Sequence, residues 1–242
     1  MYPNTVKNGL VPAGCDYKNN QDNALICKPK EYKVTEICGS SPSLTNARLF
    51  SGNKHKLIVI SLSDGLSKQS RIIQEGLNDV LLNLKSSDLK TPFTLLALGG
   101  QQPFPLLSSK DLATADKGNL IRTKVETGMQ FSAGNFSALD LDLLDNLIQE
   151  RATTQDAVDS VLYITDNRSL RDHPQEIPKS KLGVPFSWHK DGIHLLVLTT
   201  KPQGCEAWQY VEAQCLPWQG QDNDLRQIMK NTLNTFLTGS SL

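Results

Sequence analysis

The sequence lacks the features that mark nucleic-acid-binding and membrane-spanning chains. Its 242 residues carry 25 basic and 25 acidic side chains, so the formal net charge is zero. A nucleic-acid footprint needs clustered positive charge, and this balance gives it no support. No apolar run reaches 18 residues, so we expect no membrane-spanning segment in this chain.

The motifs of nucleotide binding and of serine hydrolases are also absent. Neither G-x-x-x-x-G-K-[ST] nor G-x-G-x-x-G occurs, and no G-x-S-x-G is found. These absences favour a non-enzymatic function. The alternative that stays open is a hydrolase-like or transferase enzyme that uses Ser63 and Asp166 in one cleft.

Cysteine is scarce and unevenly placed: three of the five cysteines precede residue 40 and two lie near the end. Their polar flanks are more typical of disulfide partners than of core thiols, which favours an oxidising compartment. We predict a Cys205–Cys215 disulfide. One of Cys15, Cys27 and Cys38 is then left over or pairs with a partner chain. A zinc site is disfavoured, because no C-x₂-C or His-rich spacing accompanies them.

These cysteines predict an extracytoplasmic location, which is periplasmic, secreted or on the cell surface. The cytoplasm, with five unconnected thiols, is the alternative. The first 15 residues lack the apolar region of a signal peptide. Export would therefore require a signal or anchor ahead of Met1.

Two regions differ in pattern. Residues 1–50 are rich in Asn, Lys, Pro and Gly, and only residues 31–37 alternate in a way that predicts a strand. We interpret 1–50 as an irregular, Cys-containing N-terminal arm and 51–242 as an α/β domain.

The domain region contains four continuous apolar runs, which predict strands buried on both faces: residues 57–62, 93–98, 158–166 and 193–200. Apolar stripes at helical spacing predict helices that begin near residues 67, 137 and 222. Residues 101–112 are predicted as loop, 119–126 as a short strand and 208–213 as an edge strand. This order predicts a doubly wound α/β fold with a mainly parallel sheet flanked by helices.

Three polar segments fall at the predicted carboxyl edge of this sheet, where such folds bind ligands. They are SLSDG (61–65), SAGNFS (132–137) and TDNRS (165–169). Their order resembles the von Willebrand factor type A domain. That family binds a divalent cation with D-x-S-x-S after the first strand, a threonine before a central helix and an aspartate in a T-D-G-like turn.

The resemblance implies a metal-ion-dependent adhesion site with a degenerate motif. Ser61 stands where the family has an aspartate, and Gly65 where it has the second serine. Losing a carboxylate weakens binding of a hard cation such as Mg²⁺, so we expect a weak or absent site. The candidate ligands are Ser61, Ser63, Asp64, Ser137 and Asp166.

The function implied by the resemblance is a non-enzymatic adhesion or interaction module that binds a protein partner. The contact loops would be 61–67, 101–110, 132–137 and 166–190. If a cation is bound, an acidic residue of the partner completes its coordination.

Two further segments carry interpretations of their own. The series Asp140, Asp142 and Asp145 is interpreted as the solvated face of a helix. Phe186, Trp188 and His189 have the composition of a contact patch. Packing of those aromatic side chains on the domain's own flank is the open alternative.

Overall fold

The computed structural model describes residues 15–17, 25–27, 54–89, 91–99, 103–131, 140–152, 157–167, 178, 180, 186–201 and 205–239. The chain divides into two compact units, Met1–Ser43 and Leu44–Leu242. In the first unit, β1 (Cys15–Tyr17) pairs antiparallel with β2 (Leu25–Cys27), and Cys15 lies opposite Cys27 in the register. The strand predicted at 31–37 lies outside the described residues.

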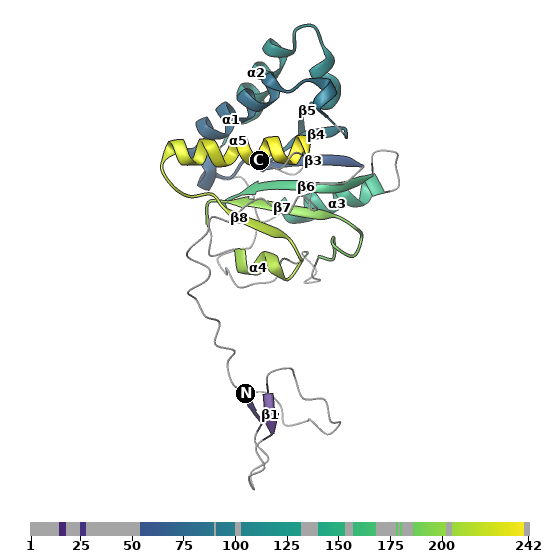
Figure 1. Ribbon diagram of the computed structural model, residues 1–242, viewed down its shortest axis with the longest axis vertical. Coiled ribbons are helices and arrows are strands. Elements are labelled where there is room, and N and C mark those ends of the chain that lie inside the picture. The colour runs from purple at the N-terminus through teal and green to yellow at the C-terminus, as the bar shows by residue number, and fades with distance from the viewer. Residues whose placement is uncertain are drawn as a thin grey trace. The chain divides into compact units, whose positions relative to one another are not determined.

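The second unit is built on a six-stranded sheet in the order β5-β4-β3-β6-β7-β8 (Figure 1). Neighbouring strands are parallel, except that β5 runs antiparallel to β4. The strands are β3 (His55–Ser61), β4 (Phe93–Leu98), β5 (Pro103–Ser108), β6 (Val158–Thr165), β7 (His194–Thr199) and β8 (Gln214–Pro217). The mainly parallel doubly wound sheet predicted from the sequence is confirmed.

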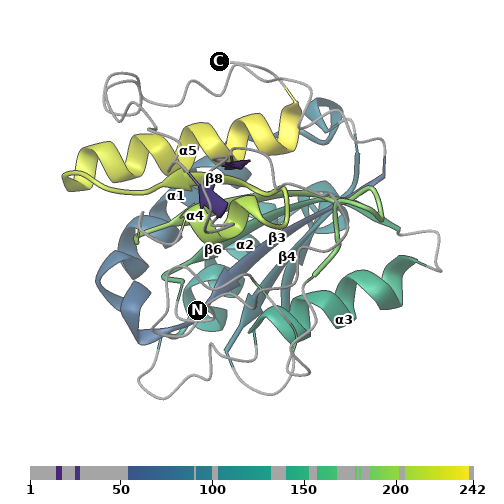
Figure 2. The same ribbon diagram turned by 90° about the horizontal axis from the view of Figure 1, so that it is seen from below.

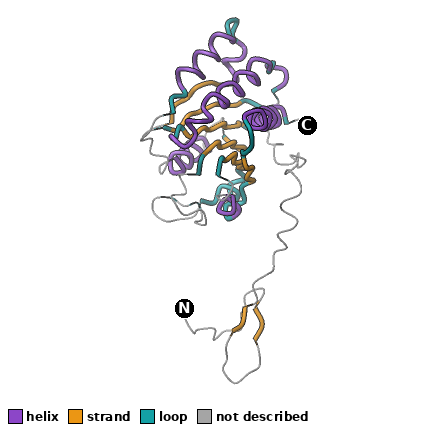
Figure 3. Tube along the Cα trace, turned by 90° about the vertical axis from the view of Figure 1, so that its left-hand side faces the viewer, coloured by secondary structure: helices purple, strands orange, loops and turns teal. Residues whose placement is uncertain are grey.

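Helices cover both faces of this sheet (Figures 2 and 3). One core cluster packs α1 (Ser70–Asn83), α2 (Lys117–Gly128) and α5 (Asp222–Thr238) on the sheet. The other packs α3 (Asp140–Ala152) and α4 (Cys205–Gln209) on the opposite face. In the described connections lie the short 3₁₀ helices η3 (Asp64–Gln69), η4 (Ser86–Asp88) and η5 (Ser109–Ala113).

The four predicted buried strands are confirmed, because each continuous apolar run forms β3, β4, β6 or β7. Three weaker predictions were wrong. Residues 103–108 form β5, 117–128 form helix α2, and the edge strand is β8 at 214–217. Trp208 and Gln209, predicted in a strand, belong to α4. No helix in the described part of the chain is long and apolar enough to span a membrane.

Two side-chain links fix the last helical segments. The predicted disulfide between Cys205 of α4 and Cys215 of β8 is confirmed, with the two Cα atoms 5.3 Å apart. Lys56 of β3 is buried, and its Nζ donates to the carbonyl oxygens of Phe236 (2.7 Å) and Leu237 (3.3 Å). These carbonyls lie in the last turn of α5, which needs such donors because its carbonyls have no partner within the helix.

Candidate functional site

The polar ends of β3 and β6 meet at one edge of the sheet. The two strands are parallel neighbours, with Ile60 opposite Ile164, so their carboxyl ends lie side by side. Ser61 is the last residue of β3, Ser63 precedes η3, and Asp166 directly follows β6. All three are buried. The sequence therefore predicted correctly that the first and third loops share an edge.

Asp140, the first residue of α3, joins this edge from the α3 face of the sheet. Its Oδ2 accepts a hydrogen bond from Ser61 Oγ at 2.6 Å and one from the Tyr163 hydroxyl at 3.3 Å. The side chain is 1% exposed, so the interpretation of Asp140 as part of a solvated helix face was wrong. Two donors from β3 and β6 make its burial tolerable, since a buried polar group needs a partner.

The environment of Asp140 alters its acidity. Burial raises the pKa of Asp140 to about 7, against the stabilising effect of the hydrogen bonds from Ser61 and Tyr163. The negative charge of nearby Asp166 raises the pKa of Asp140 further. Near neutral pH the neutral carboxylic acid is therefore well populated.

Gly65 and Asp166 approach each other closely. A Cβ placed on Gly65 would lie 2.8 Å from Asp166 Cγ and closer still to Asp166 Oδ2. Real Cβ atoms do not approach so closely, and the buried carboxylate has little room to move. Glycine at 65 therefore makes space for the Asp166 carboxylate, and no side chain fits at the position of the family's second serine.

The remaining predicted ligands differ in their surroundings. Asp64 is the first residue of η3 and is half-buried, whereas Ser137 lies outside the described residues. Ser63 Oγ is buried and makes no hydrogen bond to any described residue. Nucleophilic catalysis needs a base within hydrogen-bond reach of the hydroxyl, and the described residues supply none at Ser63.

The aromatic pair after the third loop packs inward. Phe186 and Trp188 are buried and stacked, with ring centroids 4.4 Å apart. Trp188 Nε1 donates to Asp145 Oδ1 at 2.6 Å. The contact-patch hypothesis was therefore wrong for these two rings, and packing on the domain's own flank is confirmed. His189 lies 3.5 Å from the Glu212 carboxylate.

The third loop is held by Asn167, which sequence reasoning did not single out. Its φ of 61° lies in the left-handed region, which asparagine tolerates better than most residues. Its Nδ2 donates to the carbonyl oxygen of Lys201, and its Oδ1 accepts from Trp208 Nε1, both at 3.0 Å. The Asp-Asn pair after an apolar run was the available signal, because Asn favours such turns.

No protein-family model matches the chain, and no curated protein matches its sequence. Among solved structures, the pilus adhesin SpaC from Lactobacillus rhamnosus GG, in an open conformation, is similar with a TM-score of 0.51 and 11% identity. The match covers 77% of this chain and 31% of the adhesin, so the chain spans about a third of that protein's length.

Two further structures align at lower TM-scores. A human COPII-coat protein has a TM-score of 0.45 and 8% identity, over 89% of this chain and 39% of that chain. Manganese-loaded TRAP protein from Plasmodium vivax has a TM-score of 0.37 and 14% identity, over 73% and 62%. With its mostly parallel six-stranded sheet and helices on both faces, the domain has a von Willebrand factor A-like fold.

Proposed function

We propose that this chain is a non-enzymatic interaction or adhesion module that binds a protein partner at the carboxyl edge of its sheet. The observation that carries the proposal is the convergence of segments remote in sequence on this edge. Ser61 contacts Asp140, 79 residues away, and Gly65 lies against Asp166. In sheets of this type the carboxyl edge is the usual binding surface.

Exposed side chains near this edge suit contact with a protein. Phe104 is 55% exposed and lies in β5 opposite Ala97, close to the carboxyl end of β4. Lys68 is exposed in η3, just after the first loop. Aromatic side chains are enriched in protein interfaces, so Phe104 is our proposed anchor. The proposed contact segments are 61–67, 101–110 with strand β5, 132–137 and 166–190, without the inward-packed Phe186 and Trp188.

Matched surface variants test this proposal. Phe104→Ala and Lys68→Glu change the carboxyl edge. Their controls are Tyr210→Ala, a 62% exposed aromatic residue just before β8, and Lys85→Glu, an exposed lysine after α1. The edge variants should fail to capture proteins that the wild-type chain captures from extracts of its source organism. The control variants should still capture them. Equal capture by all four variants contradicts the proposal.

We also propose an extracytoplasmic location for the module. The Cys205–Cys215 disulfide supports it, since such bonds persist in oxidising compartments. Counting reactive thiols on the denatured, unreduced protein tests the location. Protected Cys205 and Cys215 in protein isolated from its natural source agree with export, whereas five reactive thiols contradict it.

A further inference from the structure

The von Willebrand factor A-like fold raises the question of whether this edge suits the cation that the family binds. The position of the motif's aspartate holds Ser61, whose hydroxyl donates at 2.6 Å to Asp140. The position of the second serine holds Gly65, which offers no side-chain oxygen and faces the Asp166 carboxylate. Across the described residues, no three His, Cys, Asp or Glu side chains gather in an arrangement suited to a metal ion. These residues do not fit the family's site.

We infer that this edge works without a cation, because hydrogen bonds to Asp140 make the connection between loops that the motif makes through a metal ion. Ser61 at the end of β3 and Tyr163 in β6 both donate to Asp140 Oδ2. One carboxylate oxygen thereby ties β3, β6 and α3 together. Hard cations prefer several carboxylate and water oxygens, and Ser61 offers only a neutral hydroxyl where the motif has a carboxylate.

The close approach of Gly65 supports the same inference independently. In the motif this position supplies a ligand oxygen, whereas here a Cβ at Gly65 would meet Asp166. A serine therefore does not fit at 65 while Asp166 keeps its place. The two departures from the motif lie in one loop and are complementary, since the first engages Asp140 and the second accommodates Asp166.

The inference rests on the proposed function, because it concerns how a protein partner binds this edge. A partner would be recognised by the shape and side chains of the edge, and no acidic residue of the partner would complete a metal's coordination. Binding should therefore persist after chelation of divalent cations.

The test is thermal unfolding of the full chain in EDTA, in millimolar MgCl₂ and in millimolar MnCl₂. We expect the three melting temperatures to agree within about 1 °C. A cation held at one hundred times its dissociation constant would raise the melting temperature by about 5–10 °C. A saturable rise that Asp166→Asn removes and Asp222→Asn retains would overturn the inference, since Asp222 is an exposed carboxylate in the first turn of α5.

Asp140→Asn adds a second readout. The asparagine amide oxygen can accept from Ser61 and Tyr163, so we expect this variant to melt within a few degrees of wild type, still without a cation response. Cation-dependent melting in wild type that Asp140→Asn abolishes would also overturn the inference. Neither result affects the proposed function, which fails only if the edge variants Phe104→Ala and Lys68→Glu bind partner as wild type does.

Discussion

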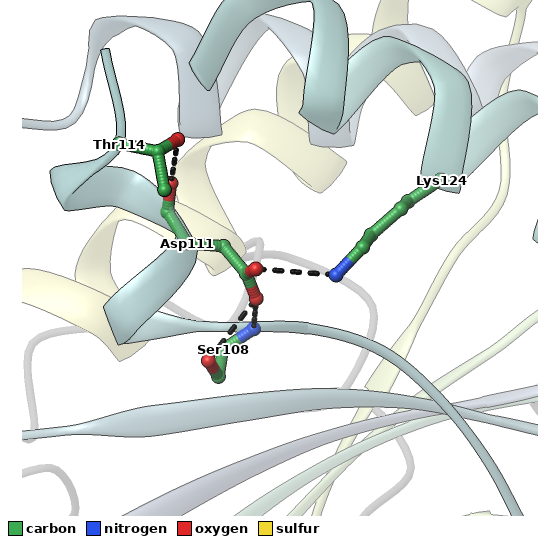
Figure 4. A network of polar contacts seen from close by, with 4 residues as sticks. All are labelled: Ser108, Asp111, Thr114 and Lys124. Atoms are coloured by element: carbon green, nitrogen blue, oxygen red, sulfur yellow. Dashed lines mark hydrogen bonds and ion pairs between the residues drawn. The ribbon is translucent and has the colours of Figure 1, made fainter. Parts of the chain in front are cut away.

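Asp140 and Asp111 each accept a hydrogen bond from a serine hydroxyl, yet they lie in different surroundings and have different roles. Asp140 accepts from Ser61 at 2.6 Å, inside the carboxyl edge. Asp111 in η5 accepts from Ser108 Oγ at 3.1 Å, from the Ser108 amide at 2.7 Å and from Lys124 Nζ at 3.1 Å (Figure 4). Asp111 thus completes a capping box and an ion pair, whereas Asp140 lies in the core.

The pKa of Asp111 is lowered and that of Asp140 is raised. Burial alone would raise the pKa of Asp111, but the Ser108 bonds and Lys124 outweigh it and hold that pKa below its ordinary value. For Asp140 burial dominates, and the neighbouring charge, Asp166, is negative. A serine donor alone therefore does not decide the protonation state of a carboxyl group. Depth of burial and the sign of the nearest charge decide it.

The largest expected effect is a loss of stability with rising pH that comes from Asp140. The contribution of Asp111 changes with pH in the opposite direction. The pKa of Asp140 rises from 3.8 to about 7 on folding, so its contribution is fully present below the unfolded pKa and is lost as pH rises through the folded one. We expect the unfolding free energy to fall by about 3–4 kcal/mol between about pH 4 and pH 8 from this group.

Urea unfolding of wild type and Asp140→Asn across that range measures the effect. The asparagine variant should have the flatter profile, because it has no carboxyl group to ionise at that site. Parallel profiles for the two proteins would show that Asp140 titrates normally.

The next effect contrasts two glycines. Gly65→Ala should lower the unfolding free energy by about 2–3 kcal/mol, because the new methyl group overlaps the Asp166 carboxylate. Gly118→Ala, in α2 beside the Asp111 region, should raise it by about 0.5 kcal/mol, because the nearest atom is Leu82 Cδ2 at 3.8 Å and alanine favours helix. Chemical denaturation measures both, and similar values for the two variants would contradict the close approach at Gly65.

The smallest effect concerns the capping box. Asp111→Ala should lower the unfolding free energy by about 1 kcal/mol at neutral pH, through loss of the bonds to Ser108 and Lys124. Because the folded pKa of Asp111 is lowered, its stabilisation is present above its unfolded pKa and disappears as pH falls through the folded one. The cost of the substitution should therefore shrink in acid, measured by urea unfolding. A cost that is unchanged in acid would assign the loss to packing.

The strands of the core were predictable because a short continuous apolar run in an α/β fold is typical of a strand buried on both faces. Each of the runs at 57–62, 93–98, 158–166 and 193–200 became a buried strand. β5 escaped prediction because Pro103 and Pro105 look like loop residues, and both prolines are compatible with an edge strand. Helix α2 was not predicted, because the polar spacing of 119–126 also suits a strand. In the structure Ile121 and Val125, four residues apart, are both buried, as one face of a helix requires.

At the edge, the sequence predicted where Ser61, Ser63 and Asp166 would lie, since strand ends follow from the strand pattern. It did not predict the burial of Asp140, because the partners of that carboxyl group are 79 and 23 residues away in the sequence. For the same reason the sequence left open whether Trp188 is exposed or packs inward: its partner Asp145 is 43 residues away, on α3. Tertiary contacts decide the environment of such side chains, and a local pattern does not encode them.

The most direct test of a cation-independent edge is NMR spectroscopy of the isotope-labelled chain during titration with Mn²⁺, whose unpaired electrons broaden the signals of nearby nuclei. Because hydrogen bonds from Ser61 and Tyr163 to Asp140 connect the strand ends without an ion, the amide signals of these three residues should broaden no more than those of the Ser108–Asp111 cluster. Selective, saturable broadening at Ser61, Asp140 and Asp166 at low Mn²⁺ concentration would contradict the account.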